Sequence, residues 1–281
     1  MISVVIPARN EASAIGSQLA ALAAQVCGDD SEVIVADNGS TDATAEIAHQ
    51  WRDRLPVRVV DASARRGPAA ARNIAASAAR GELLVFVDAD DVVMPGFMDA
   101  WRALPESVVF ASGPVVFFPV GTAPPRSSER AATQPPVQLG FLPYALGAVF
   151  AVRRDWFERA GGFDESYRTA EDVELSWRLQ GLGAELTFVP GAAVAKREAP
   201  STGATLRQYF RYGLRDPYLY RDFRDAGVPR PTVWPTVRSY AGIVARLPLL
   251  WHRAQRRRWA HQAARRVGRL VGSARAQAWY P

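Results

Sequence analysis

The sequence contains very little cysteine and lysine, and both shortages limit what the protein can be. Cys27 is the single cysteine among 281 residues, which excludes an intramolecular disulfide framework and fits a reducing compartment. Lys196 is the only lysine, so arginine carries the positive charge. No apolar run reaches the ~18 residues that a membrane-spanning helix needs. The apolar start, Ile2–Ile6, is too short for a secretory signal peptide, and we therefore expect a cytoplasmic protein.

Two nucleotide-binding motifs are also missing. No G-x-G-x-x-G follows the first expected strand, and no G-x-x-x-x-G-K-[ST] occurs anywhere in the chain. A dinucleotide-dependent dehydrogenase and a P-loop nucleotidase are therefore disfavoured. The hydrophobic content of 48% and the charged content of 22% are those of a globular protein with a full core.

The net charge of +6 conceals an uneven distribution. The stretch Pro235–Pro281 holds ten arginines and no acidic residue, which gives it a charge of +10. The rest of the chain therefore carries −4. The sequence predicts an acidic body with a basic tail.

Apolar runs alternate with helix-forming segments along the first part of the chain. Strands are expected at Ile2–Ile6, Glu32–Ala36, Val57–Val60 and Leu83–Val87, and helices from Asn10 to about Gln25, over Ala43–Trp51, and from Gly67 to before Gly81. Further on, we expect a helix over Met94–Leu104, strands at Val108–Ala111, Val115–Phe118, Gly147–Arg154 (its end leading into a helix) and Leu186–Pro190, and a helix over Glu171–Gly181. This alternation predicts an α/β fold with a doubly wound, mostly parallel sheet.

Polar residues follow three of the expected strands. The segments are Pro7–Glu11, Asp37–Asp42 and Asp88–Asp91. The carboxyl ends of parallel strands form one edge of a sheet, where open α/β sheets bind ligands. Crowded carboxylates such as those of Asp88–Asp91 repel each other unless a cation lies among them. The alternatives are an Asp-rich polar turn at Asp88–Asp91 and a capped turn at Asp37–Asp42.

Four segments together resemble family 2 glycosyltransferases of the GT-A fold. They are Val4–Glu11, Asp37–Asp42, Ala71–Asn73 and Asp88–Asp91, in the order and spacing of that family. The resemblance implies that a nucleoside-diphosphate sugar is bound by Pro7, Arg9, Glu11, Asp37, Arg72, Asp88, Ala89 and Asp90. Asp88 and Asp90 would hold Mg²⁺ or Mn²⁺, ions that prefer hard oxygen ligands. The metal would stabilise the departing nucleoside diphosphate.

A second acidic segment, Glu171–Leu175, resembles the E-D-x-[DE]-L element of the same family. The resemblance assigns the role of catalytic base to Asp172, with Glu171 near the acceptor or the diphosphate. An inverting transfer needs a carboxylate that takes the proton of the acceptor hydroxyl. The alternative is that these acids only complement the dipole at the start of a helix.

The stretch Ala192–Arg197 departs from the family pattern. Many members carry a histidine there that completes the metal shell, whereas this chain has none nearby. A charged lysine cannot ligate a metal. We therefore expect Lys196 or Arg197 to contact the diphosphate directly, with a weaker dependence on metal.

Gln208–Tyr212 resembles the Q-x-x-R-W element of family members that extend polysaccharides, with Tyr in place of Trp. The resemblance places Gln208 and Arg211 near the acceptor or the diphosphate. An aromatic stripe on a helix is, however, more often packing. We also expect Pro119–Val137, with Arg126 and Arg130, to be a mobile loop over the acceptor side, and an inert linker is the alternative.

The resulting organisation is a nucleotide-sugar-binding half over residues 1–105, an acceptor half over 106–200 and a helical, basic extension over 201–281. In that extension Trp259, Ala263, Val267, Leu270 and Ala274 share one helical face. The pattern favours a peripheral contact with an anionic membrane surface, and the alternative is a helix packed on the body. No nucleic acid is expected. The acceptor would be a glycan or a lipid-linked sugar. A nucleotidyltransferase and a catalytically inactive sugar-binding protein stay open as other functions.

Overall fold

The computed structural model describes residues 1–25, 30–125, 127–128, 131–199, 201–245 and 253–281. The chain forms two compact units. The first comprises Met1–Pro136 and Pro143–Glu198, and the second comprises Val137–Leu142 and Ala199–Pro281. Arg126 and Arg130, which belong to the expected loop over the acceptor side, lie outside the described residues.

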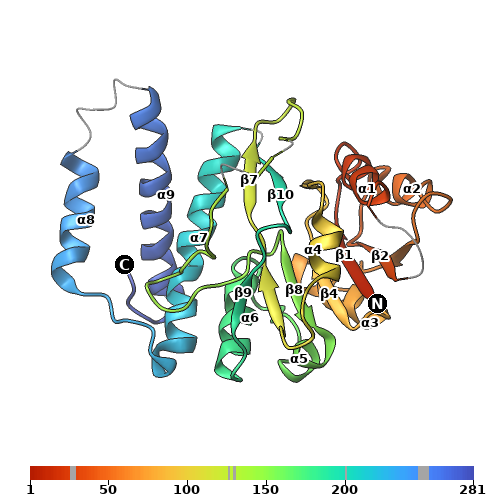
Figure 1. The fold of residues 1–281 in the computed structure, drawn as a ribbon. Helices are drawn as coiled ribbons and strands as arrows, with labels where there is room; N and C mark the ends of the chain where they lie inside the picture. Colours follow the sequence, from red (N-terminus) through yellow and green to blue (C-terminus); the bar gives the residue numbers. More distant parts are fainter. Residues whose placement is uncertain (26–29, 126, 129–130, 200, 246–252) are drawn as a thin grey trace. The chain divides into compact units, whose positions relative to one another are not determined.

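A seven-stranded sheet forms the centre of the first unit (Figure 1). Its order is β3-β2-β1-β4-β8-β6-β9. The strands are β1 (Ile2–Ala8), β2 (Ser31–Asp37), β3 (Val57–Asp61), β4 (Leu83–Phe86), β6 (Phe110–Ser112), β8 (Phe150–Arg153) and β9 (Leu186–Phe188). The pairs β1–β2, β1–β4, β2–β3 and β6–β9 are parallel, and β8 is antiparallel to β4 and β6. The predicted mostly parallel α/β sheet is confirmed.

The helices of the first unit connect these strands. They are α1 (Ile15–Ala23), α2 (Thr44–His49), α3 (Pro68–Ala78), α4 (Phe97–Arg102), α5 (Arg154–Arg159) and α6 (Glu171–Gly181). The helices α1 and α4 begin later than the sequence predicted, because the segments before them form turns.

The strand β4 is buried on both faces, as its continuous apolar run predicted. Val85 packs into a hydrophobic cluster on one side of the sheet, while Leu84 and Phe86 pack into a second cluster on the other. The ring of Phe86 meets those of Phe157 and Phe163 at centroid distances of 5.5 and 5.1 Å. Because β4 is buried on both faces, its packing fixes the position at which the acidic segment Asp88–Asp91 begins.

A second sheet of three short strands was not expected from the sequence. Its order is β5-β10-β7, formed by β5 (Val92–Val93), β10 (Val194–Arg197) and β7 (Val115–Phe118). Val194 pairs with Val93, and Ala195 pairs with Val92. The antiparallel pairing of β10 with β5 brings Lys196 and Arg197 to the segment that ends in Asp91.

The second unit consists of helices. They are α7 (Thr202–Phe223), the 3₁₀ turn η1 (Arg224–Ala226), α8 (Val233–Ala245) and α9 (Arg253–Ala276). Figure 1 shows α7 and α9 side by side. A Cβ atom added at Gly213 would lie 1.8 Å from the carbonyl oxygen of Arg265, and one at Gly268 would lie 2.2 Å from that of Phe210. The two backbones can approach this closely only because these positions are glycine.

A buried carboxylate also joins α7 to α9. Asp216 has almost no exposed side-chain surface, and its oxygens accept hydrogen bonds from Arg265, Arg269 and Gln138. The predicted helix in the basic tail is therefore present. One face of it packs on α7, while Val267 and Leu270 remain 52% and 41% exposed.

Candidate active site

The three polar loops that follow β1, β2 and β4, together with the start of α3, line one open cavity. Its volume is about 260 Å³, and its lining includes most of the donor-binding residues predicted above. The lining residues are Pro7, Ala8, Arg9, Glu11, Asn38, Gly67, Pro68, Ala71, Asp88, Ala89 and Asp90. Asp37 is not among the described residues that line it. The Oδ1 atom of Asp37 instead accepts a hydrogen bond from the backbone of Ser40.

Hydrogen bonds fix the first two loops to each other. Asn10 adopts a left-handed conformation, with φ of 57°, and its Oδ1 accepts from the backbone N–H of Thr41. The backbone N–H of Glu11 donates to Thr44 Oγ1 at 2.8 Å. Burial, followed by the negative charges of Asp90, Asp42 and Asp88, raises the pKa of Glu11 to about 7. The cavity wall therefore concentrates negative charge.

Asn38, which the sequence reading did not single out, anchors the same wall. Its Nδ2 donates to the carbonyl oxygens of Ala62 and Arg65, and its Oδ1 accepts from the N–H of Gly67, the residue before α3. An amide side chain can do this because it offers both donors and an acceptor. The sequence gives no sign of this role, because the pair Asn38-Gly39 is already accounted for by a turn and needs no long-range contact.

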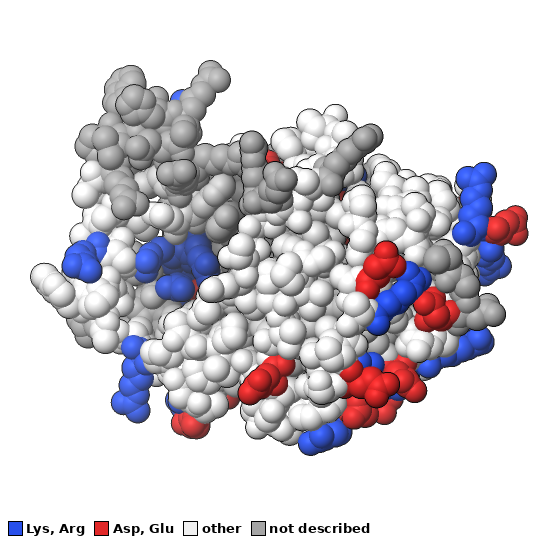
Figure 2. Space-filling model, viewed as in Figure 1, with Lys and Arg blue, Asp and Glu red and all other residues white. Residues whose placement is uncertain are grey.

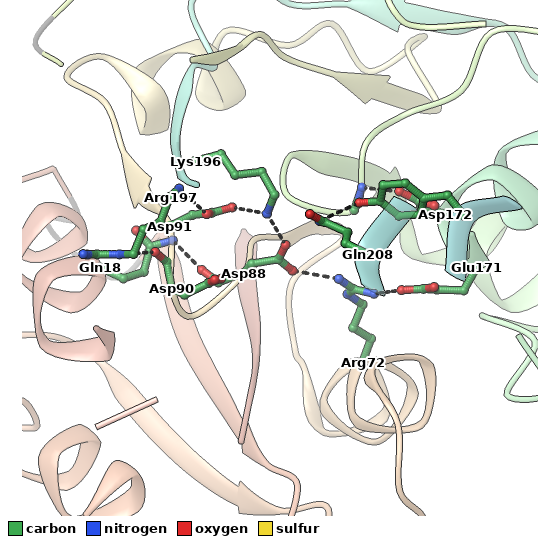
Figure 3. Close-up of polar contacts among 12 residues, drawn as sticks. Gln18, Arg72, Asp88, Asp90, Asp91, Glu171, Asp172, Lys196, Arg197 and Gln208 are labelled. Carbon is green, nitrogen blue, oxygen red and sulfur yellow. Dashed lines mark hydrogen bonds and ion pairs between the residues drawn. The ribbon is translucent and has the colours of Figure 1, made fainter. Parts of the chain in front are cut away.

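Asp88, Asp90 and Asp91 form the acidic cluster at the end of β4, with carboxylate oxygens within 4.8 Å of one another. Lys196 lies among them, as Figure 3 shows: its Nζ is 2.9 Å from Asp88 Oδ2 and 2.9 Å from Asp91 Oδ2. The paired cations Lys196 and Arg72 hold the pKa of Asp88 down, to about 2, against the effect of burial. Burial and the negative charges of Asp88 and Asp90 raise the pKa of Asp91, whereas the ammonium of Lys196 opposes this rise. Lys196 reaches the three aspartates because it belongs to β10, a strand that the sequence did not predict and that pairs with β5.

Gln18 on α1 holds the backbone on either side of the acidic cluster, at Asp88 and Val93. The sequence did not predict this role. Gln18 is fully buried, its Nε2 donates to the carbonyl oxygen of Asp88 at 3.2 Å, and its Oε1 accepts from the N–H of Val93. A polar residue inside the apolar face of α1 is the signal that could have identified it.

Arg72 on α3 links the acidic cluster to the second acidic segment (Figure 3). Its Nη2 donates to Asp88 Oδ1 at 2.8 Å, and its Nη1 donates to Glu171 Oε1 at 2.6 Å. The guanidinium also lies over the ring of Phe163, 5.4 Å from its centroid. The structure thus brings the predicted residues Arg72, Asp88 and Glu171 together.

Asp172 lies in the first turn of α6, next to Glu171. Its Oδ2 accepts a hydrogen bond of 2.8 Å from the backbone N–H of Gly147, and its Oδ1 accepts from its neighbour Val173. Burial and the charge of Glu171 raise the pKa of Asp172 to about 6, although the N–H of Gly147 and the charge of Arg72 oppose this rise. Asp172 is therefore a carboxylate poised to exchange a proton near neutral pH.

The sequence predicts Gly147 only as the start of a strand, but in the structure it lies between Arg72 and Asp172. A Cβ atom there would be 3.1 Å from Arg72 Nη2 and 3.4 Å from Asp172 Oδ2. A larger residue would crowd the guanidinium, so the absence of a side chain is part of the site. A single glycine in a strand-like sequence carries no signal for this role.

Gln208 and Arg211 lie on α7, in the second unit. Gln208 Nε2 donates to Tyr212 Oη at 2.8 Å, and Arg211 is exposed. The neighbouring Tyr209 stacks on His261 of α9, with centroids 4.4 Å apart and an interplanar angle of 9°. Part of this aromatic stripe is therefore packing, and the roles expected for Gln208 and Arg211 stay predictions.

The acidic cluster contains ligands that suit a hard divalent cation. Asp90 lines the cavity, and its carboxylate accepts no hydrogen bond from the side chain of another described residue. Mg²⁺ and Mn²⁺ favour such carboxylate oxygens, with further ligands from phosphates. The residues present therefore fit a divalent metal that is shared with a phosphate-bearing ligand.

Comparisons with known proteins agree with this geometry. Residues 3–161 match the model of "Glycosyl transferase family 2", and residues 83–279 match that of "Glycosyl transferase family group 2". The succinoglycan biosynthesis protein ExoA of Rhizobium meliloti is 30% identical over 75% of this chain and 67% of its own length. The pre-mycofactocin glycosyltransferase of Mycobacterium tuberculosis is 30% identical over 69% of this chain, which spans only 42% of that relative.

Two solved structures share the fold. The mannosyltransferase PcManGT from Pyrobaculum calidifontis, in complex with GDP-Man and Mn²⁺, matches with a TM-score of 0.69 and 23% identity over 96% of this chain and 86% of its own. TarS from S. aureus, in complex with UDP-GlcNAc, matches with a TM-score of 0.60 and 19% identity over 100% of this chain and 93% of its own. A doubly wound sheet with an acidic cluster at its carboxyl edge thus defines a GT-A glycosyltransferase fold. The chain belongs to glycosyl transferase family 2.

Proposed function

We propose that the protein is an inverting glycosyltransferase that moves a sugar from a nucleoside-diphosphate sugar to an acceptor hydroxyl. The observation that carries this proposal is the position of Asp172. It is half-buried, its pKa is raised to about 6, and its neighbour Glu171 is joined through Arg72 to Asp88 on the wall of the cavity. A proton acceptor is thus fixed relative to the site that would hold the donor.

The donor binds in the cavity formed by the loops after β1, β2 and β4. Arg9 and Glu11 line it on one side, and Asp88, Ala89 and Asp90 on the other. The complexes of PcManGT with GDP-Man and of TarS with UDP-GlcNAc support a nucleotide sugar as the ligand. Asp90 would hold a divalent cation, either Mg²⁺ or Mn²⁺, while both oxygens of the neighbouring Asp88 accept hydrogen bonds from Arg72 and Lys196. When bound, this cation stabilises the negative charge of the leaving diphosphate.

Asp172 acts as the general base in the transfer. Its carboxylate takes the proton of the acceptor hydroxyl while the hydroxyl oxygen forms a bond to the anomeric carbon. The bond from that carbon to the diphosphate oxygen breaks on the opposite face, so the configuration inverts. The N–H groups of Gly147 and Val173 orient the carboxylate. Without the N–H of Gly147, the proton-accepting oxygen would lose its fixed direction.

Release of nucleoside diphosphate from a panel of sugar nucleotides tests the function. We expect one donor to be turned over and Asp172→Asn to lower kcat by at least ~100-fold, because general-base catalysis contributes that much. Asp155→Asn is the matched control, since Asp155 is an exposed acid in the first turn of α5. Equal losses in both variants would show that the acids serve only the helix dipoles. Release of pyrophosphate would indicate a nucleotidyltransferase, and no turnover of any donor would indicate a sugar-binding protein.

We also propose that the acceptor is a glycan or a lipid-linked sugar and that the second unit contacts an anionic membrane surface. None of the described helices is long and apolar enough to cross a membrane. An open groove of about 770 Å³ between α8 and α9 is, however, mostly apolar and includes Val244, Val267, Leu270 and Trp279. A neighbouring cavity is lined by Arg238, Arg265, Arg266 and Arg269. Figure 2 shows basic side chains gathered in a hollow of this unit, while most acidic ones on this face lie elsewhere.

Exposed apolar side chains next to arginines suit the interface of an anionic bilayer. We expect the protein to sediment with vesicles of phosphatidylcholine and phosphatidylglycerol, but not with phosphatidylcholine alone. Leu270→Glu should weaken this binding, whereas Leu182→Glu should not. Leu182 is a suitable control because it is 43% exposed, close to the 41% of Leu270, but lies in the first unit. Equal binding to both kinds of vesicle would contradict the proposal.

A further inference from the structure

Lys196 lies inside the acidic cluster. Its Nζ contacts one oxygen of Asp88 and one of Asp91, each at 2.9 Å. The other oxygen of Asp88 accepts from Arg72, and the other oxygen of Asp91 accepts from the backbone N–H of Arg197. All four oxygens of these two aspartates are therefore already engaged with donors of this chain.

Asp90 differs from its two neighbours. Its carboxylate accepts no hydrogen bond from any other residue in the described ranges, and it faces the donor cavity. A divalent ion such as Mg²⁺ requires about six oxygen ligands and commonly combines one or two carboxylates with phosphate oxygens and water. One free carboxylate beside a lysine ammonium is a poor site for such an ion by itself, because the two cations repel each other.

The backbone holds Lys196 in this place. The strand β10 pairs with β7 from Val194 to Arg197 and with β5 at Val194 and Ala195. Asp91, the more deeply buried of its partners, has 0% side-chain exposure and cannot turn to solvent. Removal of Lys196 from the acidic cluster would leave that buried carboxylate with the backbone N–H of Arg197 but without a cation in the described structure to pair with, which is costly.

We infer that Lys196 makes metal binding depend on the donor. Lys196 supplies the positive charge of the acidic cluster when no nucleotide is bound, and a divalent cation is held firmly only together with a diphosphate, whose oxygens complete its ligand set. This inference rests on the proposed function for the identity of the diphosphate. It differs from the expectation that Lys196 contacts the diphosphate itself, because the ammonium acts on the metal through Asp88 and Asp91.

Titration with Mn²⁺, followed by the electron paramagnetic resonance signal of the free ion, tests this without any sugar donor. The parent protein should bind Mn²⁺ weakly alone and at least about tenfold more tightly with UDP or GDP, after correction for Mn²⁺ bound by free nucleotide. Lys196→Met and Lys196→Gln should each tighten binding without nucleotide by about tenfold or more, as expected for removing a unit charge near a divalent ion. Lys196→Arg keeps the charge and should behave as the parent does.

Arg197→Met is the matched control for charge. Its guanidinium donates to the backbone oxygen of Asp90 and lies 5.2 Å from the ring centroid of Phe118. Within the described part of the chain, this guanidinium donates no hydrogen bond to a carboxylate of the acidic cluster. We expect a smaller gain in Mn²⁺ affinity from it than from Lys196→Met. Adding Asp90→Asn to Lys196→Met should abolish the gain, because the ion then lacks its carboxylate ligand.

Two results would overturn the inference. One is a parent protein that binds Mn²⁺ equally well with and without nucleotide, a measurement that needs no variant and so does not depend on variant folding. The other is unchanged Mn²⁺ affinity in folded Lys196→Met and Lys196→Gln, with folding checked by melting in EDTA. Because no sugar donor is present, a failure to transfer sugar would contradict the proposed function while leaving this result intact.

Discussion

We predict that substitution of Arg72 strongly lowers the free energy of unfolding of the first unit. The side chain of Arg72 is 4% exposed, and it bridges Asp88 and Glu171, which are 25% and 10% exposed. In Arg72→Met, Asp88 keeps Lys196, but Glu171 loses the only hydrogen-bond donor that reaches its carboxylate among the described residues. Breaking a buried pair from one side costs about 3–5 kcal/mol, because a charge stays buried without a partner. We expect a loss of that size in the free energy of unfolding of the first unit.

The assay is hydrogen exchange of the β1 and β4 amides, which reports on the first unit alone, together with guanidinium denaturation. Arg65→Met is the control: Arg65 pairs with Glu165 at 2.9 Å but is 61% exposed, so its loss should cost below about 1 kcal/mol. Adding Glu171→Gln to Arg72→Met should restore part of the stability, since the unpaired charge is removed. A loss below about 1 kcal/mol in Arg72→Met would refute the reasoning.

Three further predictions concern the base, the helix pair and the metal. Because the pKa of Asp172 is raised to about 6, the base is protonated below that value, so kcat should fall as the pH decreases through about 6; a profile flat from pH 5 to 7 would contradict this. Gly268→Ala should lower the melting temperature of the second unit despite the ~1 kcal/mol advantage of Ala in helices, because its Cβ would meet the α7 backbone. Gly242→Ala in α8, with open space around it, should raise or preserve the melting temperature, and the reverse order would refute the packing argument. Asp90→Asn should weaken Mn²⁺-dependent activity at least about tenfold, whereas Asp99→Asn, at a side chain 82% exposed, should leave it unchanged when activity is titrated against Mn²⁺.

The strands β1, β2 and β4 could be predicted because each contains an apolar run that is buried on both faces, whereas β3 is only partly buried. Val33, Ile34 and Val35 of β2 have no exposed surface, as the run had indicated. The same logic located the polar loops at the carboxyl edge, and most of their predicted residues line the cavity. A strand buried on both faces is visible in the sequence as a run of consecutive apolar residues. The end of that run also shows where the loop at the carboxyl edge of the sheet begins.

The second sheet could not be predicted in this way. Its strand β5 has two residues, and β10 ends in Lys196 and Arg197, so neither shows the apolar run or alternation that marks a strand. Both form through pairing between residues about a hundred positions apart. The location of Lys196 within the acidic cluster, and of Gly147 against Arg72, follows from such long-range contacts and has no local signature.

The site consists of charges that alternate in sign across separate elements. Asp91, Lys196, Asp88, Arg72 and Glu171 form a continuous series of ion pairs, each with a contact between 2.6 and 2.9 Å. They come from the segment after β4, from β10, from α3 and from α6, which no stretch of local sequence connects. Glycosyl transfer requires the anomeric carbon and the base to be held in one geometry, since small misplacements lower the rate sharply. A series of ion pairs that reaches from the donor cavity to the helix of Asp172 meets this requirement. Its two cations hold it together, because among the described residues the loss of Lys196 leaves Asp91 without an ion-pair partner and the loss of Arg72 leaves Glu171 without one.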